Sequence, residues 1–444
     1  MGVFRLKKIS RGLCALVAGF ACVAAHSTTI EIGPGSDFRS AMQNLHAGDT
    51  LLLDSGTYTL TSQFQLTLVG NAAAPIVIMA KPGQHLTIHF AGTSQNIVDI
   101  VDSQFLTIEG IEFTGGSRGL RFIGGSDITV RNCSVHDVGA NAISANDHDQ
   151  DYARFNFVHN EVYNTGVTGE AFYLGCNGDA CRIHDSLVAN NYIHDLQGAS
   201  SDYQGDGIEI KKGSYANIVR DNVIHDTHYP GITMYDVNGH GAPNLVEGNI
   251  VWHTGDNGIQ ITADAIVRNN VVLSAAADAF ASLPIDGGSA ANLTIVNNTF
   301  FAANGQGIRL NGVTGAVTVA NNAIYAPTAN AIRATGTLGG IISVANAGIG
   351  SLTGVSTGFT NTGNVVNDFV SANLGGAPPQ NLIPKSALLV GAASATYLPI
   401  DDFDGFPRSR HADVGAYRAG GTPGWPLAAT FKIADHIFFG SFEP

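Results

Sequence analysis

An asparagine recurs along most of this chain, each time at a bend between two short β-rich segments. In the clearest repeat, Ile218-Val219-Arg220 precedes the bend at Asn222 and Val223-Ile224-His225 follows it. The residues aligned on this bend, 21 to 31 positions apart, are Cys133, Asn160, Asn191, Asn222, Asn249, Asn270, Asn298 and Asn322. Units of this length cannot bury a hydrophobic face alone, so successive units must stack on one another.

Each unit also holds a third short strand, which opens with glycine or with Asn-Ala. These strands fall at 119–122, 141–144, 207–210, 231–234, 258–261 and 307–310. Three short strands per unit predict an all-β fold, a single-stranded right-handed parallel β-helix. The 54 glycines agree with this turn-rich structure, because an interior glycine costs a helix roughly 1 kcal/mol. At the bend, asparagine tolerates the left-handed backbone conformation, and its amide can bond to the amide one coil away.

The N-terminal region differs from the repeat. Residues 1–25 combine a basic start, an apolar run and the small residues Val23-Ala24-Ala25, which is typical of a secretory signal peptide. The apolar run is shorter than the roughly 20 residues of a membrane span, so we expect secretion and no span in the mature chain. Residues 36–45 show helical spacing with Ser36 as the N-cap, and we expect this helix to cover the first coil.

The repeat weakens after residue 325, and we expect further coils up to about residue 417. The predicted β-helix domain with its N-terminal cap therefore spans 26–417. Residues 418–444 have the composition of a linker and a short apolar tail, a candidate for attachment to the cell surface.

The charge of the chain limits its partners. Removal of residues 1–25 takes away four basic residues and no acidic one, which changes the net charge from −14 to −18. Nucleic acid is then excluded as a partner, because its binders present basic faces to the phosphates. An acidic polymer can still bind through a local basic patch or a bridging cation. We expect a monomer.

Three cysteines follow the predicted signal peptide. Cys176 and Cys181 flank a four-residue loop that a disulfide can close in an oxidising compartment. Zinc binding is the weaker interpretation, because the sequence offers no second cysteine pair nearby. Cys133 stands at the bend position of its own repeat, which explains it without any reactivity.

A column of rings is predicted three residues beyond the bend. Its members are His136, Tyr163, His194, His225, Trp252, Leu273, Phe301 and Tyr325. A position that accepts histidine, other aromatics and leucine alike indicates packing rather than metal binding. The polar residues that follow, such as Asp137 and Asp226, are interpreted as turn residues.

Outward-facing side chains of the third strand are expected to form a polar ribbon. Since side chains alternate along a strand, Ile208 and Ile210 point inward while Glu209 and Lys211 point outward. The same alternation predicts one outward column of Arg121, Ser144, Tyr173, Glu209, Thr233, Gln260 and Arg309, and a second column of Lys211, Tyr235 and Thr262. Neighbouring coils lie about 4.8 Å apart, so the ribbon is continuous and suits an extended sugar polymer. Candidate substrate-binding residues are Arg121, Tyr173 and Gln260 on the ribbon, and His240 in a glycine-flanked loop.

The ribbon also carries the residues for acid–base chemistry. In β-elimination from a uronic acid, a base removes the proton next to the carboxylate while a cation neutralises the developing charge. Lys211 or Lys212 is the candidate base, provided that neighbours depress its pKa. Glu170, Asp206 and Glu209 are candidate oxygen ligands for Ca²⁺.

Alternative roles for these residues stay open. Acids and lysines on neighbouring coils can simply pair with one another, which contributes little to stability. Two carboxylates can instead hydrolyse a glycosidic bond by acid–base chemistry. The acidic loop 147–151 is a further candidate for cation binding, or else a solvated loop.

Several segments resemble a known family. The sequences Ala47-Gly48-Asp49-Thr50, Ser55-Gly56-Thr57-Tyr58 and Ala74-Pro75-Ile76-Val77-Ile78 resemble the opening of secreted bacterial β-helix proteins of the pectate lyase superfamily type, which include alginate and chondroitin lyases. Asp402-Phe403-Asp404-Gly405 and Asp413-Val414-Gly415-Ala416-Tyr417 resemble a common closing segment. The resemblance covers about 47–417 and implies the β-helix architecture.

At the candidate site the resemblance is partial. Calcium-dependent lyases of this type have a Glu-x-Glu strand, a base lysine and an arginine on the next coil. Here the next coil, 231–236, has no arginine, so a lyase would need Tyr235 or another group to protonate the leaving oxygen. A likeness to polygalacturonases is also incomplete, because Gly207 replaces the second aspartate of their acid pair.

The sequence therefore predicts a secreted β-helix protein that acts on an acidic polysaccharide, as a lyase with Lys211 as base and Ca²⁺ near Asp206 and Glu209. The alternatives are a glycoside hydrolase and a noncatalytic carbohydrate-binding or cell-surface protein.

Overall fold

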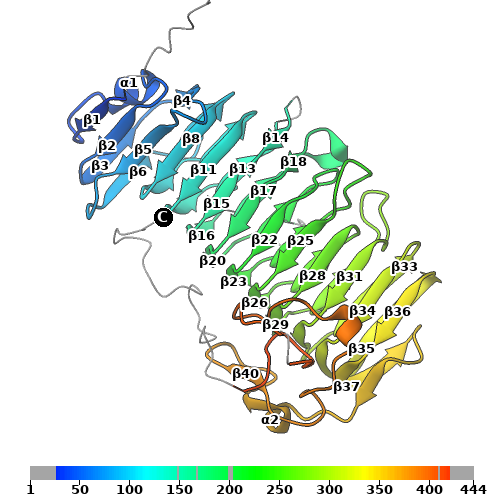
Figure 1. Cartoon of the computed structure of the whole chain (residues 1–444). Helices are drawn as coiled ribbons and strands as arrows, with labels where there is room; N and C mark the ends of the chain where they lie inside the picture. The colour runs from blue at the N-terminus through cyan, green and yellow to red at the C-terminus, as the bar shows by residue number, and fades with distance from the viewer. Residues whose placement is uncertain (1–26, 148–149, 167–168, 199–203, 409–410, 421–444) are drawn as a thin grey trace, which may run out of the picture.

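The computed structural model describes residues 27–147, 150–166, 169–198, 204–408 and 411–420. The predicted signal peptide 1–25 and most of the predicted tail lie outside these residues, as do His148 and Asp149 of the acidic loop. Over the described part of the chain, short strands stack into a long parallel β-solenoid, which confirms the predicted fold class (Figure 1).

The strands before the bends form one sheet of the solenoid, in which every pair is parallel. In order they are β1 (Thr29–Ile32), β2 (Thr50–Leu53), β5 (Ile76–Ala80), β8 (Gln104–Glu109), β11 (Ser126–Arg131), β15 (Asn156–Val158), β19 (Leu187–Ala189), β22 (Ile218–Arg220), β25 (Asn244–Glu247), β28 (Ala265–Arg268), β31 (Leu293–Val296), β34 (Val317–Ala320) and β36 (Ile341–Val344). The two-residue strands β14 (Tyr152–Ala153) and β18 (Ile183–His184) extend this sheet at one side.

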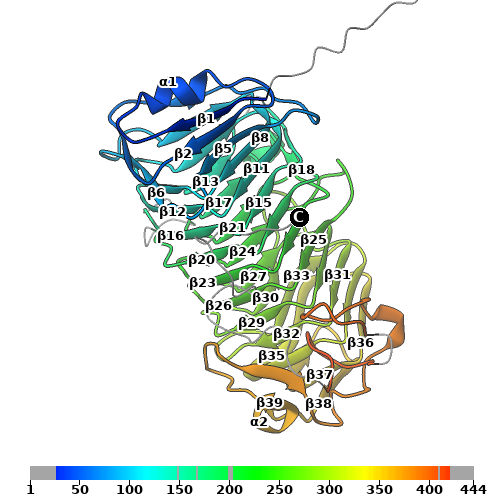
Figure 2. The ribbon, with the colours of Figure 1, turned by 60° about the vertical axis from the view of Figure 1, so that its left-hand side comes forward.

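The second sheet holds two series of strands. The strands after the bends are β3 (Gly56–Leu60), β6 (Leu86–Phe90), β9 (Glu112–Gly115), β12 (Ser134–Val138), β16 (Glu161–Thr165), β20 (Tyr192–His194), β23 (Val223–Thr227), β26 (Ile250–Thr254), β29 (Val271–Leu273), β32 (Thr299–Phe301), β35 (Ala323–Leu338), β37 (Asn346–Thr353) and β38 (Phe359–Asn361). The third strands of the coils, called the ribbon strands below, are β4 (Gln65–Leu66), β7 (Val98–Val101), β10 (Leu120–Ile123), β13 (Ile143–Ala145), β17 (Phe172–Leu174), β21 (Ile208–Ile210), β24 (Ile232–Met234), β27 (Ile259–Ile261), β30 (Phe280–Ser282), β33 (Ile308–Val313) and the second half of β35. Figure 2 shows several ribbon strands following one another along the length of the molecule.

The asparagine ladder holds the coils in register. The buried amide of each asparagine donates to the amide oxygen one coil further on, at 2.9 to 3.0 Å, from Asn160 to Asn346. The left-handed conformation, however, falls on the residue before each of these asparagines, as in Asn190 and Asp221. The bend therefore uses two residues, one for the turn of the backbone and the asparagine for the bonds between coils.

Replacement of Asn222 by alanine is expected to destabilise the solenoid by on the order of 3 kcal/mol, because it leaves buried polar groups on two neighbouring coils without partners. The lost bonds are those that the Asn222 side chain makes to Asn191, Val188 and Asn249. A lowered urea midpoint measures the effect. The exposed Asn304, replaced by alanine, serves as the control and is expected to change stability by less than about 0.5 kcal/mol. Equal effects of the two changes would contradict a stabilising ladder.

The column of rings beyond the bends is a packing stack, as predicted. His136 stacks on Tyr163 at 4.5 Å, Tyr163 on His194 at 5.0 Å, and His225 on Trp252 at 4.2 Å between ring centroids. The residues after the histidines, including Asp137 and Asp226, have positive φ angles and form turns.

The N-terminal helix α1 (Phe38–Gln43) lies over the first coils (Figure 1). Phe38 and Met42 are buried, and the Phe38 ring packs edge-on against Tyr58 at 5.2 Å. The N-cap is Asp37, whose carboxylate accepts from the Ser40 amide, so the prediction of Ser36 was one residue early.

The coils end sooner than the sequence suggested. After β38 the chain forms α2 (Val365–Asp368) and the antiparallel pair β39 (Phe369–Ser371) and β40 (Asn381–Pro384). It then runs back outside the coils (Figure 1). Buried Arg408 donates to the side chain of Asn269 at 3.2 Å, and Asn297 donates to the Asp413 carbonyl at 2.9 Å. The segment after β40 is therefore bonded to asparagine side chains of the coils and does not form coils of its own.

The two α-helices in the described part of the chain have six and four residues. Neither reaches the length or apolar character that a membrane-crossing helix needs. The remaining helical turns are the 3-10 segments η1 (Asn177–Asp179) and η2 (Ala395–Tyr397).

Candidate active site

The ribbon strands place the outward side chains in the predicted column. Strand pairing puts Arg121 beside Ser144, Ser144 beside Tyr173, Tyr173 beside Glu209, Glu209 beside Thr233 and Thr233 beside Gln260. Ala281, which was missing from the predicted column, then separates Gln260 from Arg309. The register is fixed because the alternate residues of each strand, such as Ile208 and Ile210, fill the core.

Lys211 is the centre of the candidate site. It is buried, its ammonium donates to the carboxylate of Glu209, and it lies 3.4 Å from the Tyr235 hydroxyl. The rings of Tyr173 and Tyr235 flank the ammonium at 4.7 and 4.9 Å, a cation–π arrangement. Tyr235 also points its hydroxyl at Glu209, at 3.4 Å.

The pKa of Lys211 departs from the sequence expectation. Burial favours the neutral amine, but the charge of Glu209 and the neighbouring tyrosines outweigh it, so the pKa lies above the usual value for lysine. We expected neighbouring groups to lower the pKa of Lys211. In the protein without a bound cation they raise it instead. Burial and Glu209 also raise the pKa of Tyr235, which keeps its phenol protonated at neutral pH.

Three buried carboxylates converge beside this lysine. Glu170, Asp206 and Glu209 each bring an oxygen within 4.8 Å of the others, and all are at most 5% exposed. Burial and the charges of neighbouring acids raise the pKa of Glu170 to about 8, and the same causes raise that of Asp206 well above its usual value. At neutral pH and without a cation, Glu170 and Asp206 therefore keep their protons, whereas three ionised acids beside one lysine would leave an excess of buried negative charge.

The acids are brought together by their position just before the ribbon strands. Arg118, Asn141, Glu170 and Asp206 occupy the same position, two residues before paired members of successive strands. Arg118 donates to Asn141 at 3.2 Å, and Asn141 donates to Glu170. At the next step Glu170 meets Asp206, so two acceptors face each other among the described residues when both acids are ionised.

A divalent cation fits this gap. Hard cations such as Ca²⁺ prefer several carboxylate oxygens, and the cluster supplies three from two adjacent coils. The other polar partners are already in place, since Thr233 donates to Asp206 and Asn141 to Glu170. The structure thus brings the predicted ligands Glu170, Asp206 and Glu209 together, and cation binding itself stays a prediction.

Without divalent cations, the raised pKa of Glu170 is expected to make the protein less stable as pH rises. The folded state holds the Glu170 proton up to about pH 8, whereas an unfolded chain releases it near its ordinary pKa. The resulting stabilisation is fully present below about pH 4.5 and is lost as pH rises through about 8. Thermal midpoints measured in chelator at pH 5, 6.5 and 8 test this.

In this experiment Glu170→Gln is expected to flatten the pH dependence. Glu31, a half-exposed residue in an ion pair with Lys81, provides the control Glu31→Gln, which should leave the profile unchanged. An unchanged profile in Glu170→Gln would contradict the assignment to Glu170.

A cavity of about 410 Å³ opens over these residues. Its lining comprises Glu170, Tyr173, Asn177, Gln204, Glu209, Lys211, Tyr229, Thr233, Tyr235, Gln260 and Ile285. Of the predicted substrate-binding residues, Tyr173 and Gln260 therefore reach the cavity. Asp206 is buried and does not line the cavity.

Loops from several coils contribute Asn177, Tyr229 and Ile285 to the cavity lining, and the predicted residues Lys212 and His240 contact two of these loops. Cys176 and Cys181 form the predicted disulfide, which closes the loop carrying Asp179. Asp179 accepts from His240 at 2.8 Å, and Lys212 donates to the Asp286 carbonyl at 2.6 Å. Neither Lys212 nor His240 lines the cavity, because each is held by a neighbouring loop.

Arg121 lies outside the cavity as well. It is three coils from Glu209 and pairs with Asp147 at 3.3 Å.

Sequence reasoning missed Arg118 and Asn141, although their spacing from the ribbon strands equals that of Glu170. It also missed Ile285, because no local pattern shows that its loop reaches back to Gly178, whose amide donates to Asp286 at 3.3 Å.

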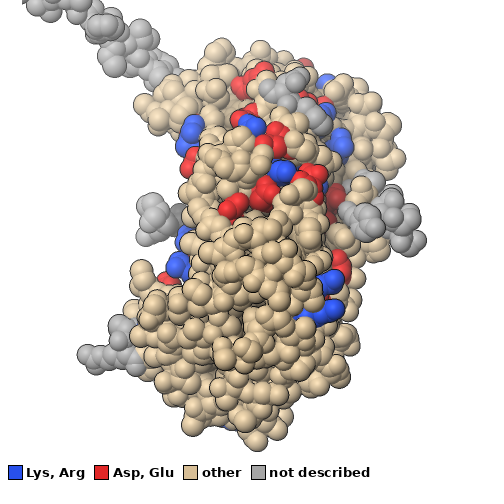
Figure 3. Space-filling view, turned by 90° about the vertical axis from the view of Figure 1, so that its right-hand side faces the viewer, with Lys and Arg blue, Asp and Glu red and all other residues tan. Residues whose placement is uncertain are grey.

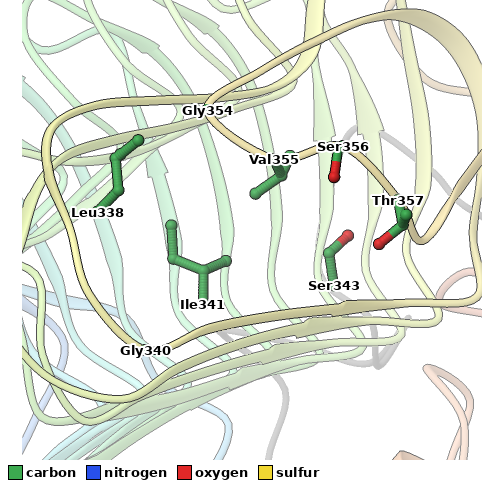
Figure 4. A pocket seen from close by; sticks show the side chains of 8 residues that line it. All are labelled: Leu338, Gly340, Ile341, Ser343, Gly354, Val355, Ser356 and Thr357. Carbon is green, nitrogen blue, oxygen red and sulfur yellow. The ribbon is translucent and has the colours of Figure 1, made fainter.

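Another cavity, of about 600 Å³, lies at the C-terminal end of the solenoid. Figure 4 shows Leu338, Ile341 and Val355 pointing into it together with the hydroxyls of Ser343, Ser356 and Thr357. Its lining contains no titratable side chain, so it offers no acid–base chemistry.

Two family descriptions match the chain. Residues 23–171 match "Pel9A-like, right handed beta helix region", and residues 204–347 match "Right handed beta helix region". Comparison with curated proteins found no match.

Solved structures of similar fold include pectate lyase Pel9A, with a TM-score of 0.52 and 16% identity over 88% of this chain and 96% of that one. The complex of XylC with xylose also has a TM-score of 0.52, with 10% identity over 89% of this chain and 99% of that one. Similarity at these identities establishes the fold and not the activity. Together with the parallel solenoid, these matches show that the chain folds as a right-handed parallel β-helix, a fold that it shares with pectate lyase Pel9A.

Proposed function

We propose that this protein is a polysaccharide lyase that cleaves a uronic-acid-containing polymer by β-elimination. The observation that carries the proposal is the buried group of Lys211, Tyr235 and Glu209 beside two further carboxylates, in one cavity on a long polar ribbon. A fold shared with a pectate lyase supports the substrate class.

The proposed roles follow from the contacts. Lys211 is the base that takes the proton from the carbon next to the uronate carboxylate. The electrons of that C–H bond form the new C=C bond, and the glycosidic C–O bond breaks with its electron pair on the leaving oxygen. Tyr235, kept protonated by its raised pKa, donates its proton to that oxygen. Since Lys211 and Tyr235 lie 3.4 Å apart, the proton can return from the lysine to the tyrosine after each turnover.

Glu170, Asp206 and Glu209 would hold a Ca²⁺ ion in the proposed enzyme. When bound, the ion supplies positive charge that neutralises the substrate carboxylate and the excess of buried acid. With the charge of Glu209 compensated, burial is the main influence left on Lys211, and burial favours the neutral amine that a base requires. Tyr235 takes the position of proton donor in a coil, 231–236, that has no arginine.

Product chemistry tests the proposal. Incubation with polygalacturonate, alginate or a glycosaminoglycan is expected to produce ultraviolet absorbance from the unsaturated sugar. Reducing ends without absorbance would instead indicate hydrolysis. Binding without any product across the panel would reject the lyase and favour a noncatalytic carbohydrate-binding protein. Because the signal peptide prediction implies secretion, we also propose that the polymer is extracellular.

A further inference from the structure

Two arginines stand side by side on the ribbon, far from the cavity. Strand pairing places Arg309 of β33 directly beside Arg333 of β35, one coil apart. Both side chains are partly exposed, while Ile308, Leu310 and Ile332 around them fill the core. Like charges at neighbouring positions of a sheet destabilise it, so the packing of the coil gives no reason for the pair.

Nearby acids compensate the charge of Arg309 but not that of Arg333. Arg309 lies near two carboxylates, that of Asp278 at 3.5 Å and that of Asp256, while its Nε atom is buried without a hydrogen-bond partner in the described part of the chain. Arg333 forms no ion pair or side-chain hydrogen bond with any described residue. Between Leu310 and Ile400 the other charged residues are Asp368 and Lys385. Asp368 is buried and bonded to Tyr325, so it does not compensate Arg333.

The C-terminal coils beyond the pair carry few charges. On the face shown in Figure 3, acidic and basic side chains gather over the N-terminal and middle coils, whereas the C-terminal coils carry almost none. Two guanidinium groups on adjacent coils, of which only Arg309 has acidic neighbours, can attract an external anion, because each guanidinium can donate two parallel hydrogen bonds to a carboxylate.

The position of the pair relates it to the candidate active site. Pairing runs from Glu209 through Thr233, Gln260 and Ala281 to Arg309, so Arg309 is four coils and Arg333 five coils from Glu209. At about 4.8 Å per coil the separations are about 19 and 24 Å. The intervening column is uncharged, so a polymer along it meets positive charge again only at the arginines.

The geometry points to a distal subsite in which Arg309 and Arg333 together bind a carboxylate of an acidic polysaccharide laid along the ribbon. This inference rests on the proposed function for the identity of the polymer. One sugar of an extended chain is about as long as one coil spacing. The subsite therefore holds a uronate about four to five sugars from the one at Lys211, and it favours long chains over short ones.

Binding of defined oligomers tests the subsite independently of turnover. The probes are saturated galacturonate and alginate oligomers of three and of eight sugars, together with carboxyl-reduced forms of the longer ones, titrated calorimetrically at low and high salt. The double variant Arg309→Gln/Arg333→Gln is compared with the wild type. The matched control is Arg220→Gln, an exposed arginine at the end of β22 in the other sheet.

The double variant is expected to bind the eight-sugar oligomers on the order of tenfold more weakly, and the loss should shrink at high salt. The ratio of eight-sugar to three-sugar affinity should fall towards one, because the long chain loses its second contact. Carboxyl-reduced oligomers should bind the wild type and the variant equally.

An unchanged affinity ratio, an equal loss in Arg220→Gln, or no binding of any uronate by the wild type would overturn the subsite. The proposed function fails separately: the length-dependent loss without any unsaturated product would retain the subsite and reject the lyase. Product formation with unchanged binding in the double variant would retain the lyase and reject the subsite.

Discussion

Replacement of Lys211 by alanine is expected to lower the rate of β-elimination by about 10²- to 10⁴-fold, the usual contribution of a positioned base. Lys211 is the lysine whose ammonium contacts both Glu209 and Tyr235 within the cavity. The measurement is the initial rate of ultraviolet absorbance on whichever uronate polymer the wild type cleaves. The rate constant should fall much more than the affinity for the polymer, because the lysine acts mainly on the reacting carbon.

Two other lysines serve as controls for this variant. Lys212→Ala removes the contact to the Asp286 carbonyl and should disturb the cavity wall, with a smaller loss that appears mainly in KM. Lys385→Ala changes an exposed residue near β40 and should leave the rate unchanged. A Lys211→Ala protein that folds, binds polymer and retains more than a tenth of the activity would contradict the assignment of the base.

Tyr235→Phe separates the two proton transfers. It keeps the ring beside the Lys211 ammonium but removes the hydroxyl that faces Lys211 and Glu209. If this hydroxyl protonates the leaving oxygen, the change should lower the rate of β-elimination less for substrates with a good leaving group than for the natural polymer.

The architecture was predictable because it depends on a local pattern that repeats. The spacing of the bends and the alternation of Ile208 and Ile210 fix which side chains face outward, so the column containing Tyr173, Glu209 and Gln260 followed from the sequence. Pairing between coils then converts distant sequence positions into neighbours about 4.8 Å apart. That is why the grouping of Glu170, Asp206 and Glu209 could be predicted without atomic positions.

What was not predictable depends on loops and on charge balance. Lys212 follows Lys211 directly, yet it bonds to a carbonyl of a loop 74 residues away, and no local signal indicates this. His240 is similarly held by Asp179 of the disulfide loop. The pKa of Lys211 depends on the balance between burial and Glu209, which requires atomic positions.

The cluster of three buried acids predicts a strong response to divalent cations. Addition of Ca²⁺ at about 100 times its dissociation constant is expected to stabilise the folded protein by about 2.7 kcal/mol, provided that the unfolded chain does not bind it. Thermal midpoints with Ca²⁺ and with chelator measure this. Chelation should also abolish product formation, because the substrate carboxylate and Glu209 then remain uncompensated beside Lys211.

Asp206→Asn is expected to raise stability in chelator while it lowers activity. Asparagine keeps an oxygen to accept the hydrogen bond from Thr233 but removes one of three adjacent buried acids. The variant should therefore be more stable than the wild type in chelator, should gain little from Ca²⁺ and should lose activity. The exposed Asp185, replaced by asparagine as a control, should preserve the response of the wild type. A wild-type protein that is fully active in chelator, with no shift of its thermal midpoint on addition of Ca²⁺, would show that the three carboxylates only pair with Lys211 and hold no cation.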